Sequence, residues 1–399
     1  VKQPKIATKA YGSDKNKKID CIANVTIFDD VMYENLTVGK TYTLVAGLYD
    51  INKGEYVGKE VSHDFVPTSA NGTETVEIPN VNTTALMGDS IVVVEKLVSN
   101  KIVYVNHDDL TDTDQTVTVK GPGIKTVAMN AAKDDKTIDA VTDSVIVDTV
   151  TLTDLAVGTS YEITVGLYDV DTEEYITGIA VDGSANNLVQ FKATKADMEM
   201  DVKITVDTTE RLGHKLVVVE TLRTGETVVA EHTALTDTNQ TVTVKTPTIK
   251  THAFGADEKS TTIDCGKDVT IIDVVDYTGL AVGKIYTLTA GLRAAATGDM
   301  ISTEEPASSV PMTEDGSLKI TINHVDTTKY IGGKIVVIES LKIDDKEIVN
   351  HDDIKDVDQT VTVKTPTIKT LASDKISKNK ILDKSENAVI VDTVSYTDL

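Results

Sequence analysis

The sequence has no tryptophan, only four phenylalanines and only two cysteines in 399 residues. Two cysteines exclude the dense disulfide framework that holds small secreted domains together. Positive charge is also scarce: 39 Lys and Arg face 63 Asp and Glu, which gives a formal net charge of −24. This balance argues against nucleic acid and anionic membranes as partners, because both attract clustered basic residues. No run of 18 apolar residues occurs and no signal peptide opens the chain, so we expect no membrane insertion.

A repeat runs through the whole sequence. The segment 114–120 reads DQTVTVK, and it returns as NQTVTVK at 239–245 and as DQTVTVK at 358–364. A short linker with a proline follows each copy, and a new unit then opens with the pattern Ile-x-Thr-x-Ala. Intervals of 118, 125 and 119 residues separate these openings and indicate tandem domains, because solenoid repeats are much shorter. The openings begin at Ile6, Ile124, Ile249 and Ile368.

We therefore predict three complete domains and the start of a fourth. Each unit is rich in Val, Thr and Ile, in short alternating segments separated by Gly, Asn, Asp and Pro. This pattern is typical of a β-sandwich of about seven to nine strands. The predicted fold class is all-β, with tandem Ig-like antiparallel β-sandwich domains, and the short linkers favour an extended rod. The predicted boundaries are 1–120, 121–245, 246–364 and, for the incomplete unit, 365–399.

Several polar residues fall on strand faces that should be buried. Alternate residues of a strand share a face. Thr8 shares its face with Ile6, Asp29 and Glu95 each lie within an alternating row of apolar residues, and Gln115 shares its face with two valines. Burying an unpaired carboxylate costs several kcal/mol, so a chain rarely places one there without a partner.

These polar residues recur at constant spacing. In each complete unit Asp follows Thr by 21 or 22 residues, His follows Glu by 12, and Gln follows His by 8. The one insertion, six residues between Asp and Glu of the second unit, leaves these His and Gln offsets unchanged. The three sets are Thr8, Asp29, Glu95, His107 and Gln115; Thr126, Asp148, Glu220, His232 and Gln240; and Thr251, Asp273, Glu339, His351 and Gln359.

Such a set can carry out an acyl transfer on the chain itself. Two carboxyl groups forced together in a dry site cannot both ionise, so one keeps a proton and can donate it to a carbonyl oxygen as a hydrogen bond. Histidine can take a proton from a hydroxyl and pass it to a leaving amine. Threonine supplies the nucleophile and glutamine the amide carbonyl. The product is an ester between Thr Oγ1 and Gln Cδ with loss of ammonia, and fixed geometry supplies the effective molarity that the attack requires.

At this point the sequence resembles a known family, the T-Q ester-bond domains (VaFE repeats) of Gram-positive surface adhesins. The resemblance covers essentially the whole chain and rests on Ile-x-Thr-x-Ala, on Val-Val-Val-Glu or Val-Val-Ile-Glu, and on Gln-Thr-Val eight residues after His. It implies a self-formed ester between the first and last strands of each domain. The bonds implied by position are Thr8–Gln115, Thr126–Gln240 and Thr251–Gln359. The implied proton-sharing pairs are Asp29 with Glu95, Asp148 with Glu220, and Asp273 with Glu339, and the implied proton shuttles are His107, His232 and His351.

The resemblance also implies a place of action. It indicates the stalk of a bacterial cell-surface adhesin, extracellular and attached to the cell wall through a region outside this sequence. We expect a monomer whose partners are its own neighbouring repeats, with a host ligand bound by a tip domain elsewhere. We expect no cofactor, no metal and no enzyme in the usual sense, because the cross-linking is a single turnover on the chain itself.

The incomplete unit carries only part of the set. It has Thr370 and Asp392 but no corresponding Glu, His or Gln. We therefore expect Thr370 to stay a free hydroxyl in this chain, and the natural protein to continue into at least one more domain.

Other interpretations of the same residues predict different features. A Lys–Asn isopeptide bond needs an inward lysine, whereas Lys125, Lys250 and Lys369 are predicted to face outward. The acidic run after His107 lacks the Gly and terminal Glu of a calcium loop, and solvated turns are the simpler interpretation. An adhesin module that binds a host protein or glycan through its loops predicts one unit with an aromatic-rich loop, and a hydrolase predicts a cleft around Asp, Glu and His.

Overall fold

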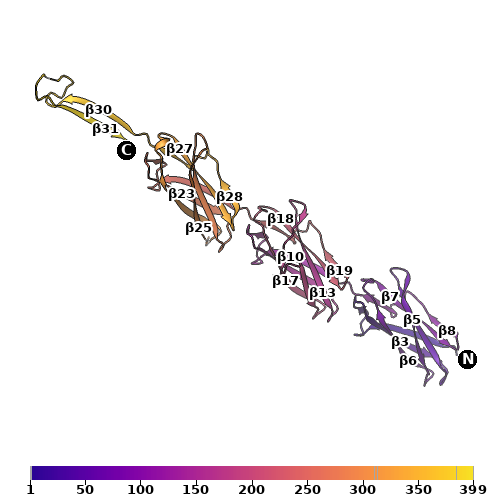
Figure 1. Ribbon diagram of the computed structural model, residues 1–399. Coiled ribbons are helices and arrows are strands. Elements are labelled where there is room, and N and C mark those ends of the chain that lie inside the picture. The colour runs from indigo at the N-terminus through magenta and orange to yellow at the C-terminus, as the bar shows by residue number, and fades with distance from the viewer. Residues whose placement is uncertain (1, 310, 312, 383, 399) are drawn as a thin grey trace. The chain divides into compact units, whose positions relative to one another are not determined.

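The computed structural model describes residues 2–309, 311, 313–382 and 384–398. Their regular structure is β-strand throughout, apart from the 3-10 turn η1 (Thr328–Tyr330), and each complete repeat folds into two sheets (Figure 1). This confirms the predicted all-β class of tandem sandwich domains. Over the described ranges, no helix is long and apolar enough to cross a membrane.

Domain 1 pairs a three-stranded sheet with a six-stranded one. Its strands are β1 (Lys5–Gly12), β2 (Lys18–Ile19), β3 (Val25–Glu34), β4 (Tyr42–Asp50), β5 (Glu55–Phe65), β6 (Gly72–Val81), β7 (Ser90–Ser99), β8 (Ile102–His107) and β9 (Thr116–Val119). The small sheet has the order β1-β3-β6, and the large sheet the order β2-β9-β7-β4-β5 with β8 beside β7. One pairing departs from the predicted antiparallel pattern, because β2 runs parallel to β9. A turn closed by the Gly12 amide on the Asn16 carbonyl, at 2.8 Å, carries the chain from the small sheet to the edge of the large one.

Domain 2 has the same two sheets with more strands. These are β10 (Gly123–Asn130), β11 (Thr137–Ile138), β12 (Ser144–Thr153), β13 (Ser160–Asp169), β14 (Glu174–Tyr175), β15 (Ala180–Val181), β16 (Leu188–Lys192), β17 (Met198–Val206), β18 (Lys215–Thr224), β19 (Thr227–His232) and β20 (Thr241–Val244). The small sheet has the order β10-β12-β17-β15, and the large one β11-β20-β18-β13-β14 with β16 beside β13 and β19 beside β18. These strands outnumber the prediction, because the long edge strand β5 of domain 1 is divided here. Both β14 and β16 pair with β13, while β15 between them joins the other sheet, in the stretch that holds the six-residue insertion.

Domain 3 repeats the topology of domain 1. Its strands are β21 (Thr248–Gly255), β22 (Thr262–Ile263), β23 (Val269–Thr278), β24 (Tyr286–Ala294), β25 (Met300–Ser309), β26 (Gly316–Val325), β27 (Lys334–Ile343), β28 (Lys346–His351) and β29 (Thr360–Val363). The sheet orders are β21-β23-β26 and β22-β29-β27-β24-β25, with β28 beside β27. The three first strands β1, β10 and β21 therefore occupy equivalent edges.

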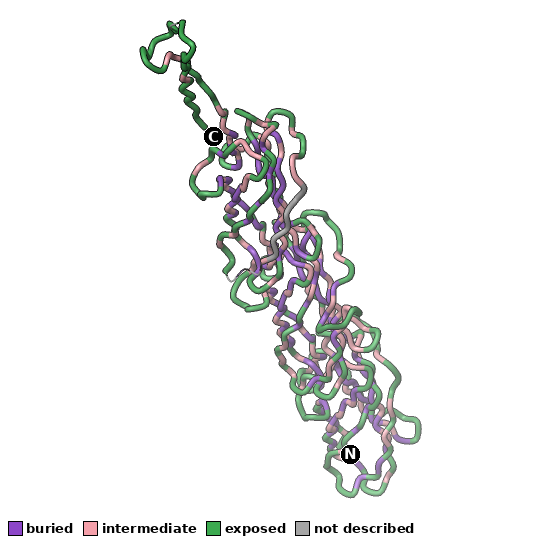
Figure 2. Tube along the Cα trace, turned by 60° about the vertical axis from the view of Figure 1, so that its left-hand side comes forward, coloured by how far each residue is buried: buried purple, intermediate pink, exposed green. Residues whose placement is uncertain are grey.

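The core of each domain lies between its two sheets. Burial alternates along β3, where Ile27, Asp29 and Val31 are enclosed and the two residues that alternate with them are only partly covered. In domain 3 the enclosed cluster takes Ile271 and Ile322 from the small sheet and Val337 from the large one. Burying one such side chain contributes about 1.5–3 kcal/mol relative to leaving it exposed. Figure 2 shows buried residues along the strands of every complete domain.

A hairpin begins the fourth repeat. It consists of β30 (Thr367–Asp374) and β31 (Ile390–Thr397), paired antiparallel. Thr370 lies opposite Val394, two residues from Asp392, as the equivalent residues do in the complete domains. Most of the hairpin, Thr370 and Asp392 included, is exposed (Figure 2).

Candidate functional site

The threonines of the predicted sets lie on the first strand of each domain and face the core. Thr126 on β10 is 3% exposed, and Thr8 on β1 and Thr251 on β21 are equally buried. Strand alternation is the cause, because Thr126 lies between the inward residues Ile124 and Ala128. A potential nucleophile is therefore held inside each sandwich.

The two carboxyl groups of each set come from opposite sheets. Asp148 lies on β12 of the small sheet and Glu220 on β18 of the large sheet, and both are fully buried. Both strands are internal to their sheets, so their inward side chains meet between the layers and interact by a hydrogen bond. The corresponding pairs are Asp29 with Glu95 and Asp273 with Glu339.

Both carboxyl groups of the pair have a raised pKa, and the glutamate has the higher one. Burial first, and then the charge of Asp148, raise the pKa of Glu220 to about 10. Burial also raises the pKa of Asp148, to about 6, against the opposing effects of Glu220 and the charge of His232. Glu220 is therefore protonated at neutral pH and Asp148 ionised. Burial acts in the same direction in the other domains, raising the pKa of Glu95 and Glu339 to about 10 and that of Asp29 and Asp273 as well.

The oxygens of the pair also require a shared proton. In the described part of the chain, no hydrogen-bond donor meets Glu220 Oε1 or Asp148 Oδ1, although both atoms are buried. Buried acceptors are almost always satisfied. One proton held between Glu220 and Asp148 satisfies both of them.

The histidines lie beside the glutamates because a hairpin pairs them. Glu220 on β18 and His232 on β19 are direct cross-strand neighbours, which explains the constant offset of 12. His232 Nδ1 lies 2.7 Å from Thr126 Oγ1, and its Nε2 lies 2.8 Å from Asp237 Oδ2. Because the carboxylate accepts the Nε2 proton, Nδ1 keeps its lone pair towards the hydroxyl. In domains 1 and 3 the distances from Thr Oγ1 to His Nδ1 are 3.4 and 3.3 Å.

An aspartate that the sequence analysis missed holds each histidine. Asp237 Oδ2 faces His232, while Asp237 Oδ1 accepts the backbone amide of Asn239 at 2.8 Å, in the turn that leads to the glutamine. The bond from Asn239 first, and then the one from His232, hold the pKa of Asp237 below its usual range. In domains 1 and 3, Asp112 and Asp356 lie 3.6 and 3.0 Å from the histidine Nε2. A His-x4-Asp spacing, present three times, is the feature of the sequence that marks these residues.

The glutamines are buried and lie one residue before the last strand of their domains. Gln240 Nε2 lies 3.0 Å from Glu220 Oε2 and 3.3 Å from His232 Nδ1. Gln240 Oε1 meets no donor among the residues described. A half-turn of the amide places this oxygen against Glu220 Oε2, which donates to it when the proton of the acid pair lies on Oε2 and not between the two carboxyl groups. Gln115 and Gln359 contact Glu95 and Glu339 in the same way.

Domain 2 thus brings every member of its predicted set into one buried cluster. Thr126 Oγ1 lies within hydrogen-bond distance of both His232 Nδ1 and Glu220 Oε2, the latter at 3.1 Å. The cluster holds a hydroxyl, a base, an acid and an amide, with Asp237 orienting the base. Domains 1 and 3 contain equivalent clusters of their own sets. The hairpin of the fourth repeat places Thr370 and Asp392 in the same register but on an exposed surface.

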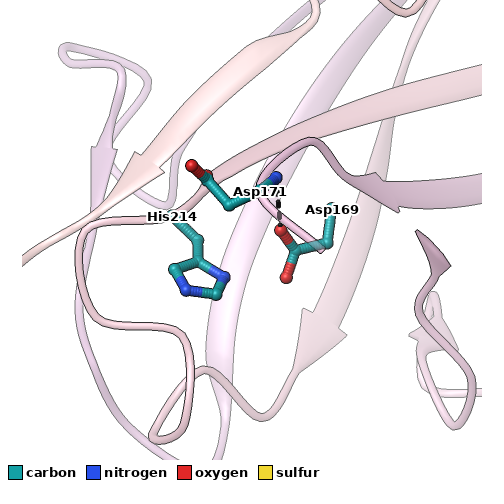
Figure 3. Close-up of side chains that lie close together, drawn as sticks. All are labelled: Asp169, Asp171 and His214. Carbon is teal, nitrogen blue, oxygen red and sulfur yellow. Dashed lines mark hydrogen bonds between the residues drawn. The ribbon is translucent and has the colours of Figure 1, made fainter. Parts of the chain in front are cut away.

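A second kind of buried carboxylate has a local role. Asp169, at the end of β13, accepts the backbone amides of Asp171 and Thr172 at 3.0 and 3.3 Å (Figure 3, where His214 is also drawn). Asp50 does the same for the turn after β4. Domain 3 has Ala294 at the end of the equivalent strand. These aspartates satisfy turn amides, so we assign them to the fold and not to the cluster.

The isopeptide interpretation finds no support at the predicted lysines. Lys125, Lys250 and Lys369 are all exposed, as strand alternation predicts. The side chains of Lys125 and Lys250 therefore point away from the interiors of their sandwiches.

The fold and the recurring cluster define a protein of tandem β-sandwich domains, each with one buried Thr, acid-pair, His and Gln site. The family model described as "T-Q ester bond containing domain" matches residues 4–119, 122–244, 247–363 and 366–399. The chain therefore belongs to this family, which confirms the resemblance found in the sequence.

Comparison with solved structures gives a distant likeness. Two of the matching chains are crystal forms of a bacterial adhesin from Mobiluncus mulieris, described as containing intramolecular disulfide, isopeptide and ester bond cross-links. The identities are 15% and 18%, the matches cover 63% and 69% of this chain and 88% and 92% of the adhesin chains, and both TM-scores are 0.28. Scores this low carry no argument about this chain. No curated protein matches.

Proposed function

We propose that the three complete domains each close an intramolecular ester, Thr8–Gln115, Thr126–Gln240 and Thr251–Gln359, with release of ammonia. One observation carries the proposal. His232 Nδ1 lies 2.7 Å from the Thr126 hydroxyl and 3.3 Å from the Gln240 amide nitrogen. A single base therefore lies beside both the hydroxyl that loses a proton and the amide group whose nitrogen must receive one.

The bonds and protons of the proposed reaction balance without a cofactor. His232 Nδ1 takes the hydroxyl proton while Thr126 Oγ1 bonds to Gln240 Cδ and forms a tetrahedral intermediate. The bond from Cδ to Nε2 then breaks, and His232 returns the proton to the departing nitrogen. The products are one ester and one ammonia, and His232 is neutral again. The reaction runs once per domain, so the protein is its own substrate and not an enzyme.

The protonated glutamate acts on the carbonyl oxygen. As Oγ1 attacks, negative charge develops on Gln240 Oε1, and the Glu220 proton stabilises it in a site that excludes water. Asp148 stays ionised beside it and balances the positive charge that His232 gains during the reaction. The acid pair thus supports both charged ends of the transition state.

Position and burial explain how so weak a nucleophile can react. Holding two groups in reacting geometry supplies effective molarities of about 10⁵–10⁸ M. Thr126 lies on β10 of the small sheet and Gln240 directly before β20 of the large sheet, and both are at most 3% exposed. Ammonia leaves, while bulk water is kept from the ester that remains.

We infer that the chain is part of the stalk of a bacterial cell-surface adhesin, outside the cell and anchored through another region. Membership of the T-Q ester bond family supports this role, and the net charge of −24 suits a solvated surface that repels its neighbours. A bond between the first and last strands carries force past the strands between them, which gives mechanical and proteolytic resistance. The partners are then neighbouring repeats of the same chain, and a host ligand binds elsewhere.

Intact mass tests the esters directly. The purified chain is expected to weigh less than its sequence by three molecules of ammonia. Gln240→Ala should reduce the deficit to two, because its domain has lost the acyl group. Gln190→Ala is the matched control, since Gln190 also bonds a glutamate, Glu162 at 3.0 Å, but is exposed. A chain at its full sequence mass would refute the proposal.

The role of Asp237 can be tested by kinetics. In Asp237→Asn the side-chain amide can donate to His232 Nε2, which leaves the ring proton on Nδ1, facing the hydroxyl. We expect the domain 2 ester to form at least about 100-fold more slowly, as when a triad aspartate is replaced. Cell-free synthesis with a short labelling pulse, acid quenching and peptide mass mapping gives the rate for each domain. Domains 1 and 3 are internal controls, and an unchanged domain 2 rate would contradict the orienting role.

A further inference from the structure

A lysine beside the cluster ties together the two strands that the ester joins. In domain 2 the Lys136 ammonium donates hydrogen bonds to the carbonyls of Ala128 and Asn239. Ala128 lies two residues after Thr126, and Asn239 directly precedes Gln240. The Ala128 amide also donates to the Asn239 carbonyl, at 2.9 Å. The Lys136 ammonium and the Ala128 amide therefore both hold the Asn239 carbonyl, directly before Gln240.

The other domains provide a natural comparison. In domain 1 the Lys17 ammonium donates to the carbonyl of Asp114, the residue before the glutamine. Domain 3 has Thr261 at this position, two residues before the isoleucine of its second strand. Domain 3 keeps the backbone bond, from the Ala253 amide to the Asp358 carbonyl at 2.9 Å, and among its described residues no ammonium group donates to that carbonyl. The lysine is therefore an addition to a shared backbone arrangement.

The lysine also places positive charge next to the acid pair. Lys136 is half-buried; burial lowers its pKa, whereas Asp148 and Asp237 raise it. In turn its charge favours the ionised form of Asp148, which leaves the shared proton on Glu220. The other charged groups that act on Asp148 are His232 and Asp201. Those around Lys17 are Asp114, Lys9, Asp29 and Asp112.

We propose that Lys17 and Lys136 are positioning residues for ester formation: each holds the carbonyl of the residue directly before its glutamine, and Lys136 also holds the first strand. This inference rests on the proposed ester chemistry. Domain 3 carries out the same reaction without this contribution.

Pulse labelling with peptide mass mapping tests the proposal in the full chain. Lys136→Met is expected to slow the domain 2 ester about tenfold or more, because small displacements of reacting groups are costly. In this variant the acidic limb of the pH–rate profile of the domain 2 ester should move to higher pH, since Asp148 ionises less readily without the Lys136 ammonium. Lys136→Arg, which keeps the charge and the donors, should restore most of the rate. Thr261→Lys should accelerate the domain 3 ester.

The controls separate this inference from the ester proposal. Lys195→Met changes an exposed lysine of domain 2 outside the cluster, and should leave all three rates unchanged. Two results would overturn the role of the lysine and leave the ester proposal intact. One is a domain 2 ester rate and pH profile that Lys136→Met does not change. The other is equal slowing of that ester by Lys136→Met and Lys136→Arg. Thr261→Lys adds a group to domain 3 and therefore gives a test that does not depend on the folding of a weakened domain. If Thr261→Lys does not accelerate the domain 3 ester, that result contradicts the proposal. A wild-type chain without ammonia loss would reject the esters and this inference together.

Discussion

Glu220→Gln will slow the domain 2 ester by about 10²–10³-fold, the size of effect expected when the stabilisation of a developing oxyanion is impaired. Glu220 is buried between the sheets, and burial raises its pKa to about 10, so it carries a proton at neutral pH. Glutamine has nearly the same shape and can still donate a hydrogen bond. Its amide proton is far less acidic, and it cannot share a proton with Asp148. The variant therefore removes the acid and preserves the packing.

The rate is measured for each domain in the same chain after pulse labelling. Domains 1 and 3 should close normally, which shows that the chain has folded. Glu226→Gln, on the exposed turn between β18 and β19, is the matched control and should change nothing. If Glu220→Gln closes its ester at the wild-type rate, hydrogen bonding alone suffices and protonated Glu220 is not the acid.

Strand alternation made most of the cluster predictable from sequence. Thr8, Asp29, Glu95 and Gln115 each interrupt an apolar row of period two, and the structure buries all four. The side chain of a strand residue has only two directions available, so one misplaced polar residue is informative. His107 was found by its spacing alone, and the hairpin of β7 and β8 gives that spacing its physical cause.

Features outside regular strands were not predictable in this way. Asp112, Asp237 and Asp356 lie in turns, where no periodicity indicates a direction and exposed acidic residues are common. The parallel pairing of β2 with β9 involves only two residues on each strand, too few to leave a pattern. The division of protons between Asp148 and Glu220 depends on which other groups surround each carboxyl, and spacing along the chain does not contain that information.

Thr126→Val will lower the free energy of unfolding of domain 2 by about 5 kcal/mol, the chain-entropy estimate for a closed loop of roughly 114 residues. Valine has the shape of threonine without the hydroxyl, so the ester is lost and the packing is kept. Urea unfolding followed by hydrogen exchange and mass spectrometry reports on domain 2 peptides separately. Thr149→Val is the control, because the Thr149 hydroxyl, on the neighbouring strand, donates to Asp201 at 2.9 Å. Equal stability of the two variants would show that no covalent loop had been opened.

Thr126→Val also allows the effect of the acid pair on the pH dependence of domain 2 stability to be measured. Its folded state keeps the Glu220 proton up to a pKa of about 10, whereas the unfolded chain loses it near the ordinary glutamate pKa of 4.5. The folded state therefore binds more protons between these values, so its stability is greatest at low pH and falls as the pH rises. One proton corresponds to at most about 1.4 kcal/mol per pH unit. Asp148, with a pKa raised to about 6, adds a contribution of the same sign at the acidic end. Domain 2 of Thr126→Val should be less stable at pH 8 than at pH 5, and the opposite trend would mean that Glu220 is ionised in the fold.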